Sequence, residues 1–236
     1  MNVSEAIILA GGKGKRMRSI TQDKIPKSLT LIQSQSILEW ELKWLAREKV
    51  SHVILATGHL SHVIEDHMGT EYSCDFGKID LTYSPEKEKL GSGGAVKLAA
   101  EQLSTNHSYL VNGDILSNAK LEDMKSLHFA SDVYATMYLT KMRSPYGVVN
   151  YKKNLITEFK EKPLLDVFIH GGIDIIQSDQ FDRFPDRGQM EDTIFVEFAE
   201  ENKFAAYRPK ELDFWMSIDS EKDYDNANTN WLGIAK

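Results

Sequence analysis

The feature that most constrains the fold is an alternation of short apolar runs and amphipathic stretches through the first 140 residues. Apolar runs at residues 6–10, 53–56 and 109–111 have the length and composition of buried strands, and residues 79–83 and 133–139 add two more. Helical spacing appears between them, at residues 61–67, 95–103 and 121–130 and from Ser36, where Glu39 completes a capping-box pattern. This rhythm predicts an α/β fold with a mixed, mainly parallel sheet and helices on both faces.

The rhythm changes after residue 140. Short strands are expected at residues 147–150, 155–159, 172–176, 204–207 and 214–216, and helices at residues 180–184, 191–200 and 220–228. We therefore expect a single domain over residues 1–236, in which residues 141–236 complete the sheet and cover a site formed by residues 1–140.

Composition excludes several classes of protein. The net charge of −7 argues against a nucleic-acid partner. No apolar run approaches the roughly 18 residues of a membrane span, so no membrane association is expected. The single cysteine, Cys74, excludes an internal disulfide framework, and a cytoplasmic location is the default expectation.

A glycine-rich loop directly follows the first apolar run, with Gly11, Gly12 and Gly14 placed before a cluster of basic residues that ends at Lys27. Glycines let backbone N–H groups approach a ligand closely, and the basic side chains indicate that the ligand is anionic, most simply a phosphate chain. The glycine spacing differs from the G-x-G-x-x-G fingerprint and disfavours a nicotinamide oxidoreductase. As an alternative, the loop is an ordinary turn beside a solvated charge run.

Other polar stretches follow the later strands. Residues 84–94 follow the third strand and residues 112–114 the fourth, and ligands of open α/β sheets bind outside the carboxyl ends of strands. Asp114 is therefore a candidate Mg²⁺ ligand, or else a turn aspartate that caps a helix. Lys162, before Pro163, is a candidate for a second anionic group, or else part of a surface turn.

Taken together, these motifs resemble the sugar-1-phosphate nucleotidylyltransferase family. The resemblance spans nearly the whole chain in the family's order. It rests on residues 9–17 and 26–28, 90–95, 112–114, 146–147, 159–163, 171–173 and 215–224. The stretch Glu86–Ala95 is most similar to heptose-1-phosphate and mannose-1-phosphate guanylyltransferases.

The resemblance implies a Rossmann-like, glycosyltransferase-A type fold of the nucleotide-diphospho-sugar transferases and Mg²⁺-dependent transfer of a nucleotidyl group, GMP from GTP, to a sugar 1-phosphate. Uridylyl or cytidylyl transfer is the alternative within the family. The implied catalytic residues are Arg16, on the leaving pyrophosphate, and Lys27, at the α-phosphate. The implied nucleotide-binding residues are Leu9, Ala10, Gly11, Gly12, Gly14, Glu86, Gly91, Gly93 and Asp114. The implied sugar-phosphate residues are Gly147, Glu161, Lys162 and Gly172. Self-association into a homo-oligomer is also expected for a small member of this family.

One departure from the family pattern bears on the metal. The late motif of the family carries a carboxylate ligand where this chain has Ser217, and a carboxylate occurs two residues later, at Asp219. Residues i and i+2 of an extended strand share a face, so Asp219 can join Asp114 as a metal ligand if the strand extends that far. Otherwise Asp219 is part of the turn into the next helix. The alternative hypothesis is that the protein is a catalytically silent regulatory relative that binds nucleotide sugars.

Overall fold

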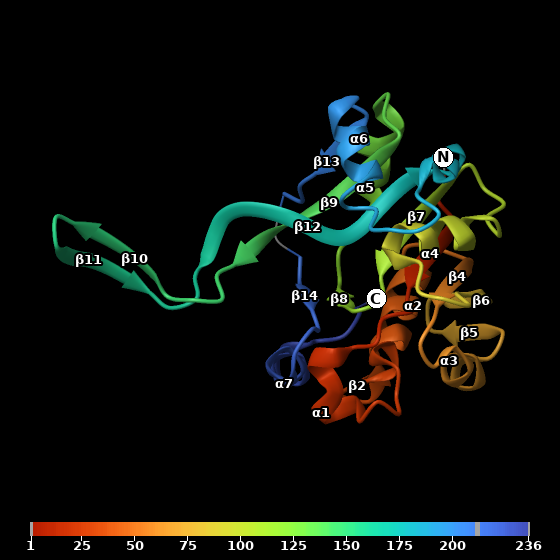
Figure 1. Ribbon diagram of the computed structural model, residues 1–236, viewed down its shortest axis with the longest axis horizontal. Helices are drawn as coiled ribbons and strands as arrows, with labels where there is room; N and C mark the ends of the chain where they lie inside the picture. The colour runs from red at the N-terminus through yellow and green to blue at the C-terminus, as the bar shows by residue number, and fades with distance from the viewer. Residues whose placement is uncertain (1, 211–212, 236) are drawn as a thin grey trace.

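An eight-stranded sheet organises the molecule. The computed structural model describes residues 2–210 and 213–235, and its sheet has the order β13-β9-β12-β7-β1-β4-β6-β5 (Figure 1). The strands are β1 (Glu5–Leu9), β4 (His52–Thr57), β5 (Glu71–Cys74), β6 (Gly77–Pro85), β7 (His107–Asn112), β9 (Ala135–Arg143), β12 (Leu164–Gln177) and β13 (Phe204–Tyr207). The central strands β7, β1, β4 and β6 are parallel, and β12 lies antiparallel between β7 and β9.

The helices cover both faces of this sheet. They are α1 (Arg18–Thr21), α2 (Ile37–Arg47), α3 (Ser61–Met68), α4 (Gly91–Ala100), α5 (Glu122–Ala130), α6 (Ile194–Glu200) and α7 (Glu221–Asn230), with 3₁₀ turns η1 (Lys15–Met17), η2 (Lys27–Leu29) and η3 (Ser178–Arg183). None of the helices among these residues is long and apolar enough to cross a membrane.

Strand β1 shows why both faces are covered. Ala6 and Ile8 belong to one core cluster with Leu42 of α2, whereas Ile7 belongs to a second cluster with Val96 of α4. All of these side chains are inaccessible to solvent. Because successive strand residues point to opposite faces, a strand that is apolar at every position must be covered twice. The predicted α/β fold class is confirmed.

The predicted capping box at the start of α2 is present. Ser36 Oγ accepts a hydrogen bond from Glu39 N at 3.2 Å, and Glu39 Oε2 accepts one from Ser36 N at 2.7 Å. Such caps contribute about 1 kcal/mol to stability. They fix the start of the helix that packs beneath the candidate site.

Several boundaries differ from those expected. The helix predicted at residues 180–184 is the 3₁₀ segment η3, and the strand predicted at residues 172–176 is the end of the fourteen-residue β12. Strand β5 was not expected, because residues 71–74 are mostly polar and show only a weak apolar pattern. In the structure, only alternate positions of this strand are partly buried. The short strands β2 (Leu31–Ile32), β3 (Gln35–Ser36) and β8 (Ile115–Ser117) were also missed.

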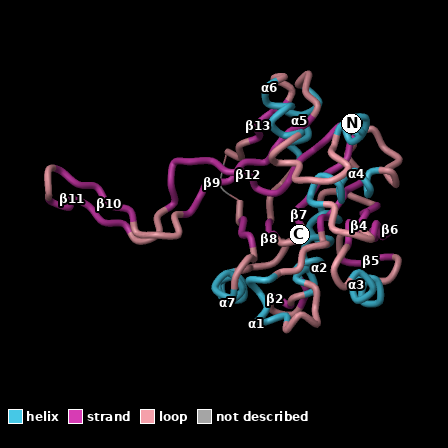
Figure 2. Tube along the Cα trace, viewed as in Figure 1, coloured by secondary structure: helices cyan, strands magenta, loops and turns pink. Residues whose placement is uncertain are grey.

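Residues 141–236 complete the sheet but do not all lie over the site. Strands β10 (Val148–Lys152) and β11 (Leu155–Lys160) form a two-stranded hairpin that extends far from the sheet (Figures 1 and 2). The expectation that this whole segment covers the site is therefore wrong for the hairpin. Strand β14 (Trp215–Ser217) instead pairs with β8, next to the end of β7.

Candidate nucleotide-binding and phosphate site

A cavity of about 360 Å³ lies where the loops after β1, β6 and β7 meet. These are the carboxyl ends of parallel neighbours, the usual position of a ligand in an open α/β sheet. The cavity is lined by Leu9, Gly11, Gly12, Ala56, Thr57, Glu86, Lys89, Gly91, Ser92, Ala95, Asn112, Gly113, Asp114, Gln189 and Glu191.

Glycine is required in two of these loops because backbones approach each other closely. A Cβ on Gly11 would lie 3.2 Å from Gly58 N, and a Cβ on Gly113 would lie 2.6 Å from Leu9 O. Gly113 N donates to that same Leu9 oxygen at 3.1 Å. The loops after β1 and β7 are therefore held in direct contact at the cavity floor.

A charged cluster adjoins the cavity. Lys27 Nζ donates to Asp114 Oδ2 at 2.7 Å and to Asp219 Oδ1 at 2.9 Å. Arg16 Nη2 donates to the same Asp219 oxygen at 2.9 Å. The Lys27 side chain is 12% exposed, whereas Arg16 is 72% exposed and reaches into solvent. Residues from the first loop, the β7–β8 turn and the start of α7 thus converge on one point.

Ser217 supports Asp219 rather than standing in for it. Its hydroxyl donates to Asp219 Oδ2 at 2.6 Å, although strand β14 already ends at Ser217. Partial burial alone would raise the pKa of Asp219. The hydrogen bonds from Ser217 and Lys27, together with the nearby Arg16 charge, outweigh burial and hold the pKa of this carboxyl below its usual value. Asp219 is therefore kept ionised beside Asp114.

A buried carboxyl supports Asp114 from below. Glu41 of α2 accepts a hydrogen bond from Ile115 N at 3.1 Å, and Ile218 N donates to Asp114 O at 2.8 Å. Burial raises the pKa of Glu41 well above its usual value. The backbone on both sides of the Asp114 carboxylate is therefore fixed by buried contacts.

These two carboxylates suit a hard cation. Asp114 Oδ2 and Asp219 Oδ1 both accept a hydrogen bond from the Lys27 ammonium group, at 2.7 Å and 2.9 Å. The two carboxylates therefore lie close enough to share a bound cation. Mg²⁺ takes oxygen ligands, commonly one or two carboxylates completed by water and phosphate oxygens. Within residues 2–210 and 213–235, no group of three or more His, Cys, Asp or Glu side chains is arranged to hold a metal ion. The Asp114 and Asp219 carboxylates therefore suit a metal ion whose remaining ligands are phosphate oxygens and water.

Six of the nine residues expected to bind the nucleotide line the cavity: Leu9, Gly11, Gly12, Glu86, Gly91 and Asp114. Ala10, Gly14 and Gly93 are not among the lining residues. Gly14 has a φ of +55° and packs on Lys27, since a Cβ there would lie 3.0 Å from Lys27 Cβ. Gly93 donates from its N–H to Gly188 O at 3.0 Å. These glycines shape the cavity wall without touching its interior.

The residues expected to hold the sugar phosphate are divided between two places. Gly172 has a φ of +69° and lies against Asn112 of the cavity, where a Cβ would be 2.9 Å from Asn112 Nδ2. Gly147, Glu161 and Lys162 lie at the base of the hairpin, where Lys162 Nζ is 3.3 Å from Glu161 Oε1. None of these three residues lines the cavity.

Lys162 nevertheless faces the start of α7. The nearby ammonium group of Lys162 lowers the pKa of Lys222. Lys222 follows Asp219 by three residues. The hairpin base therefore adjoins the chain segment that carries the charged cluster.

Sequence reasoning missed Gln189 and Glu191. Both line the cavity, and the Ser92 hydroxyl donates to Gln189 Oε1 at 3.0 Å and to Glu191 Oε2 at 2.7 Å. They sit on the irregular segment before α6, which returns to α4 through the Gly93–Gly188 contact. A loop of this kind carries no periodic signal, so no pattern in the sequence pointed to it.

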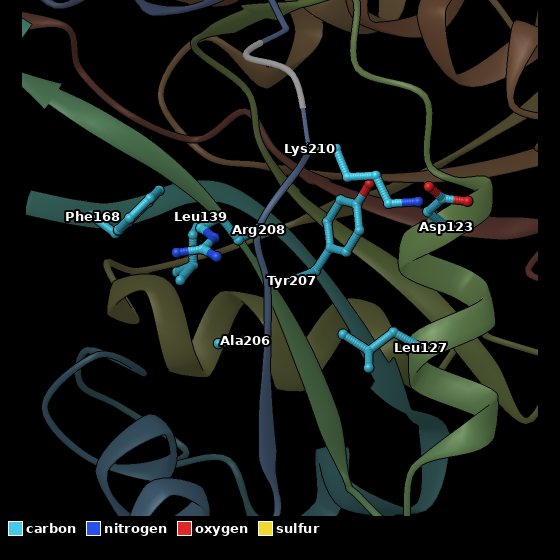
Figure 3. Close-up of a pocket in the computed structure, with 8 residues that line it drawn as sticks. All are labelled: Asp123, Leu127, Leu139, Phe168, Ala206, Tyr207, Arg208 and Lys210. Atoms are coloured by element: carbon cyan, nitrogen blue, oxygen red, sulfur yellow. The ribbon is translucent and has the colours of Figure 1, made fainter. Parts of the chain in front are cut away.

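A larger hollow of about 610 Å³ lies elsewhere, between α5 and β13 (Figure 3). Its lining includes Leu127, Phe168, Tyr207, Arg208 and Lys210. It contains none of the residues expected from the sequence to bind substrate. The smaller cavity is therefore the candidate site.

Known proteins resemble this chain in sequence and in fold. A model of the family described as "Nucleotidyl transferase" matches residues 5–231, nearly the whole chain. The chain belongs to the nucleotidyl transferase family. Mannose-1-phosphate guanyltransferase beta-A of Xenopus laevis is 34% identical over 229 residues, which are 93% of this chain and 62% of that protein. The chain thus spans less than two thirds of the length of this relative.

Two further known proteins match this chain over nearly their whole length. The D-glycero-alpha-D-manno-heptose 1-phosphate guanylyltransferase of Campylobacter jejuni is 33% identical over 226 residues, which are 93% of this chain and 96% of that protein. The crystal structure of HddC from Yersinia pseudotuberculosis complexed with GMP-PN has a TM-score of 0.73 and 22% identity, covering 97% of this chain and 100% of that one. The latter likeness establishes the nucleotide-diphospho-sugar transferase fold.

Proposed function

We propose that the protein transfers a nucleotidyl group from a nucleoside triphosphate, GTP, to a sugar 1-phosphate, with release of pyrophosphate. The observation that carries this proposal is the Lys27–Asp114–Asp219 cluster beside the glycine-lined cavity. Two carboxylates, a shielded lysine and an arginine are the groups that a phosphoryl-type transfer needs, because such a transfer depends on positioning and charge neutralisation. Family membership supports the same reaction class.

The proposed reaction forms one bond and breaks one. An oxygen of the sugar phosphate attacks the α-phosphorus of the nucleotide, and the bond from that phosphorus to the bridging oxygen of the leaving pyrophosphate breaks. Lys27, fixed by two carboxylates, is the proposed donor to the α-phosphate. Arg16, which is largely exposed, is free to turn toward the leaving pyrophosphate as a planar, bidentate donor.

Asp114 and Asp219 are the proposed ligands of Mg²⁺. When bound, the ion supplies neutralisation of the developing phosphate charge and orientation of the phosphate oxygens. Ser217 holds Asp219 in place, and Glu41 and Ile218 hold the backbone beside Asp114. We therefore propose that Asp219 supplies the carboxylate ligand that the family has at the position of Ser217.

The sugar-phosphate side of the site is proposed at Gly147, Glu161, Lys162 and Gly172. The nearness of the Lys162 and Lys222 ammonium groups supports this proposal, because two neighbouring cations favour an anion between them. Phe159 covers Gly147, where a Cβ would lie 2.6 Å from the ring, so only glycine leaves room for that ring beside Glu161. Residues 1–140 would then bind the nucleotide and residues 141–236 the sugar phosphate.

Guanine is the proposed base because the heptose-1-phosphate and mannose-1-phosphate guanylyltransferases are the relatives described above. Glu86 lines the cavity and accepts a hydrogen bond from Leu90 N at 2.9 Å, so its carboxylate is fixed before any ligand arrives. The proposed location is the cytoplasm, where nucleoside triphosphates and sugar phosphates are available.

The test measures pyrophosphate release with Mg²⁺, each of GTP, UTP, CTP and dTTP, and a panel of sugar 1-phosphates. Release with GTP is expected, and Lys27→Ala and Asp114→Ala should abolish it. Lys24→Ala, in the same loop but exposed, is the matched control and should stay active.

Three outcomes would contradict parts of the proposal. Release with UTP but not with GTP would refute the choice of base. An active Asp114→Ala protein would remove the metal assignment. No release with any pair, together with tight nucleotide binding, would favour the regulatory relative over the enzyme.

A further inference from the structure

The nucleotide cavity has two sides that differ in their polar groups. Asp114, which belongs to the charged cluster, follows β7, whereas Ser92 lies in the first turn of α4, after β6. Strands β1 and β4 separate β7 from β6 in the sheet. On the proposed function, on which this inference rests, the phosphates of a nucleoside triphosphate lie at the Asp114 side. The base is then directed toward the Ser92 side, where Gln189 and Glu191 complete the lining.

The Ser92 side of the cavity holds more hydrogen-bond acceptors than donors. The Ser92 hydroxyl lies 3.0 Å from Gln189 Oε1 and 2.7 Å from Glu191 Oε2, and it accepts a hydrogen bond from Met190 N at 3.0 Å. A hydroxyl has a single hydrogen, so it donates to one of these two oxygens at a time. Ser92 N is 3.4 Å from Gln189 Oε1, a long contact. The remaining acceptors therefore call for donors supplied by a ligand.

Two polar groups on this side have no partner in the described part of the chain. Glu191 Oε1 and Gln189 Nε2 make no hydrogen bond within residues 2–210 and 213–235, and no basic side chain there lies within 4.0 Å of the Glu191 carboxylate. His170, which lines a neighbouring groove together with Glu191, bonds instead to the buried Asp174 at 2.8 Å. The cavity wall therefore presents an amide donor beside two carboxylate oxygens that can each accept.

Guanine is the nucleobase whose hydrogen-bonding edge complements this set. Its Watson–Crick edge presents the acceptor O6 and then two adjacent donors, N1–H and the 2-amino group. Uracil and thymine present one N–H between two carbonyl oxygens, and cytosine and adenine present an amino group beside an unprotonated ring nitrogen. A carboxylate set against any of these four bases brings an acceptor against an acceptor, and such unpaired contacts cost affinity.

Glu86, the other glutamate that lines the cavity, is directed at the chain itself. Its Oε2 accepts a hydrogen bond from Leu90 N at 2.9 Å, and its Oε1 lies so near Gly58 that a Cβ on this glycine would be 2.6 Å from it. Both oxygens of Glu86 thus face neighbouring backbone. Glu191 is therefore the glutamate whose carboxylate is left to accept hydrogen bonds from a base.

The loop that carries Gln189 and Glu191 is held in place without a ligand. Gly188 N donates to Leu90 O at 2.8 Å, and Gly93 N donates to Gly188 O at 3.0 Å. These two backbone hydrogen bonds tie the loop to the start of α4. A preorganised wall of this kind loses little conformational entropy when it binds a base.

We propose that Gln189 and Glu191 select guanine: the Glu191 carboxylate accepts from N1–H and the 2-amino group, and the Gln189 amide donates to O6. The 2-amino group then distinguishes guanine from hypoxanthine, which lacks it. A hydrogen bond to a charged group changes affinity by about 10- to 100-fold, so loss of the 2-amino group is measurable. Glu191 is a specificity-determining residue in this arrangement and takes no part in bond formation.

Isothermal titration calorimetry of the full chain, with Mg²⁺ and without sugar phosphate, tests the proposal. The wild type should bind GTP at least tenfold more tightly than ITP, whose base is hypoxanthine, and than XTP, whose xanthine has a carbonyl in place of the 2-amino group. Glu191→Gln should weaken GTP binding at least tenfold and bind XTP more tightly than GTP, because the new amide donates to the 2-carbonyl.

Two further variants separate recognition of the base from other effects. Gln189→Leu should weaken GTP and ITP binding by the same factor, since both bases carry O6. Asp192→Asn, at an exposed neighbouring position outside the cavity lining, removes the same charge as Glu191→Gln and should leave the affinities for GTP and XTP unchanged. The Tm of each variant confirms that it is folded.

The inference fails on any of three results. Equal affinities of the wild type for GTP and ITP would show that the 2-amino group is not recognised. An unchanged GTP affinity of Glu191→Gln would remove Glu191 from the base site. Weaker binding of GTP, ITP and XTP by one common factor in Glu191→Gln would show that Glu191 only holds the loop. Failure of the proposed reaction is a separate result, because a wild type that prefers GTP in this way but releases no pyrophosphate contradicts the enzyme and not the selection of guanine.

Discussion

Replacing Lys27 with methionine should change metal binding and turnover in opposite directions. The Lys27 ammonium lies 2.7 Å from Asp114 and 2.9 Å from Asp219, so it neutralises the two carboxylates that are proposed to hold Mg²⁺. Lys27→Met keeps a long, unbranched side chain at this position and removes its positive charge. The two carboxylates then face each other without that cation, and a divalent ion becomes the better partner for them.

The size of the effect follows from Coulomb's law. Two unit charges 4 Å apart interact by about 4 kcal/mol at an effective dielectric constant of 20, and a divalent ion doubles the repulsion that Lys27 exerts. Both carboxylates are about a third exposed, and solvent screening reduces the effect to about 1–2 kcal/mol. The affinity for the metal should therefore rise about 5- to 30-fold. Turnover should fall by about 10²- to 10³-fold, the usual cost of removing one donor to a developing phosphate charge.

Mn²⁺ is the practical probe, because electron paramagnetic resonance reports the free ion directly. Titration of Mn²⁺ into wild type, Lys27→Met and the exposed control Lys24→Met gives the affinity, and pyrophosphate release gives kcat. Weaker Mn²⁺ binding by Lys27→Met, with the fold intact, would refute the idea that Lys27 competes with the metal. An unchanged kcat would remove Lys27 from the reaction.

Three further predictions concern stability and ionisation. Burial would raise the pKa of Glu5, but hydrogen bonds from His52, Thr105 and Ser104 lower it from 4.5 to about 2. The resulting stabilisation of about 3 kcal/mol is present above pH ~4.5 and is lost as pH falls toward 2. The free energies of unfolding of wild type and Glu5→Gln, measured in urea, should therefore differ by about 3 kcal/mol at pH 7 and become equal in acid. Gly113→Ala should lower Tm, since its Cβ would lie 2.6 Å from Leu9 O, and a Tm equal to that of wild type would contradict the required backbone approach. Ser217→Ala should raise the pKa of Asp219 and move the acidic limb of the kcat profile to higher pH; an unmoved limb would show that this hydroxyl does not hold the carboxylate ionised.

The parts of the fold that the sequence predicted well are those with a strong local pattern. Strands β1, β4 and β7 each contain a run of three or four consecutive apolar residues, and Ser36 with Glu39 marks the start of α2. Strand β5 alternates only weakly, and its pairing with β6 depends on the turn at residues 75–76 rather than on apolar burial. Both hairpin strands were predicted, but their projection into solvent was not, because nothing in a strand pattern says which surface will cover it.

The candidate site shows the same division. Glycines and charged residues directly after strands, such as Gly11 and Asp114, could be expected at the cavity because the carboxyl ends of parallel strands share one edge. Asp219 could be proposed from its spacing, but its contact with Lys27 depends on the path of the chain beyond β14. Glu191 could not be found, since its place depends on a loop held by Ser92.

The antiparallel position of β12 has a consequence for synthesis of the chain. Strand β7 pairs with β1 on one side, but its other edge pairs only with β12, which begins at Leu164. A nascent chain that has completed β7 therefore presents an unpaired edge with Tyr109, Leu110 and Val111 while more than fifty further residues emerge. Such an edge is a template for pairing with other chains. The interval between β7 and β12 is thus the stage at which aggregation competes most directly with folding, and slower translation of this interval would lengthen the exposure.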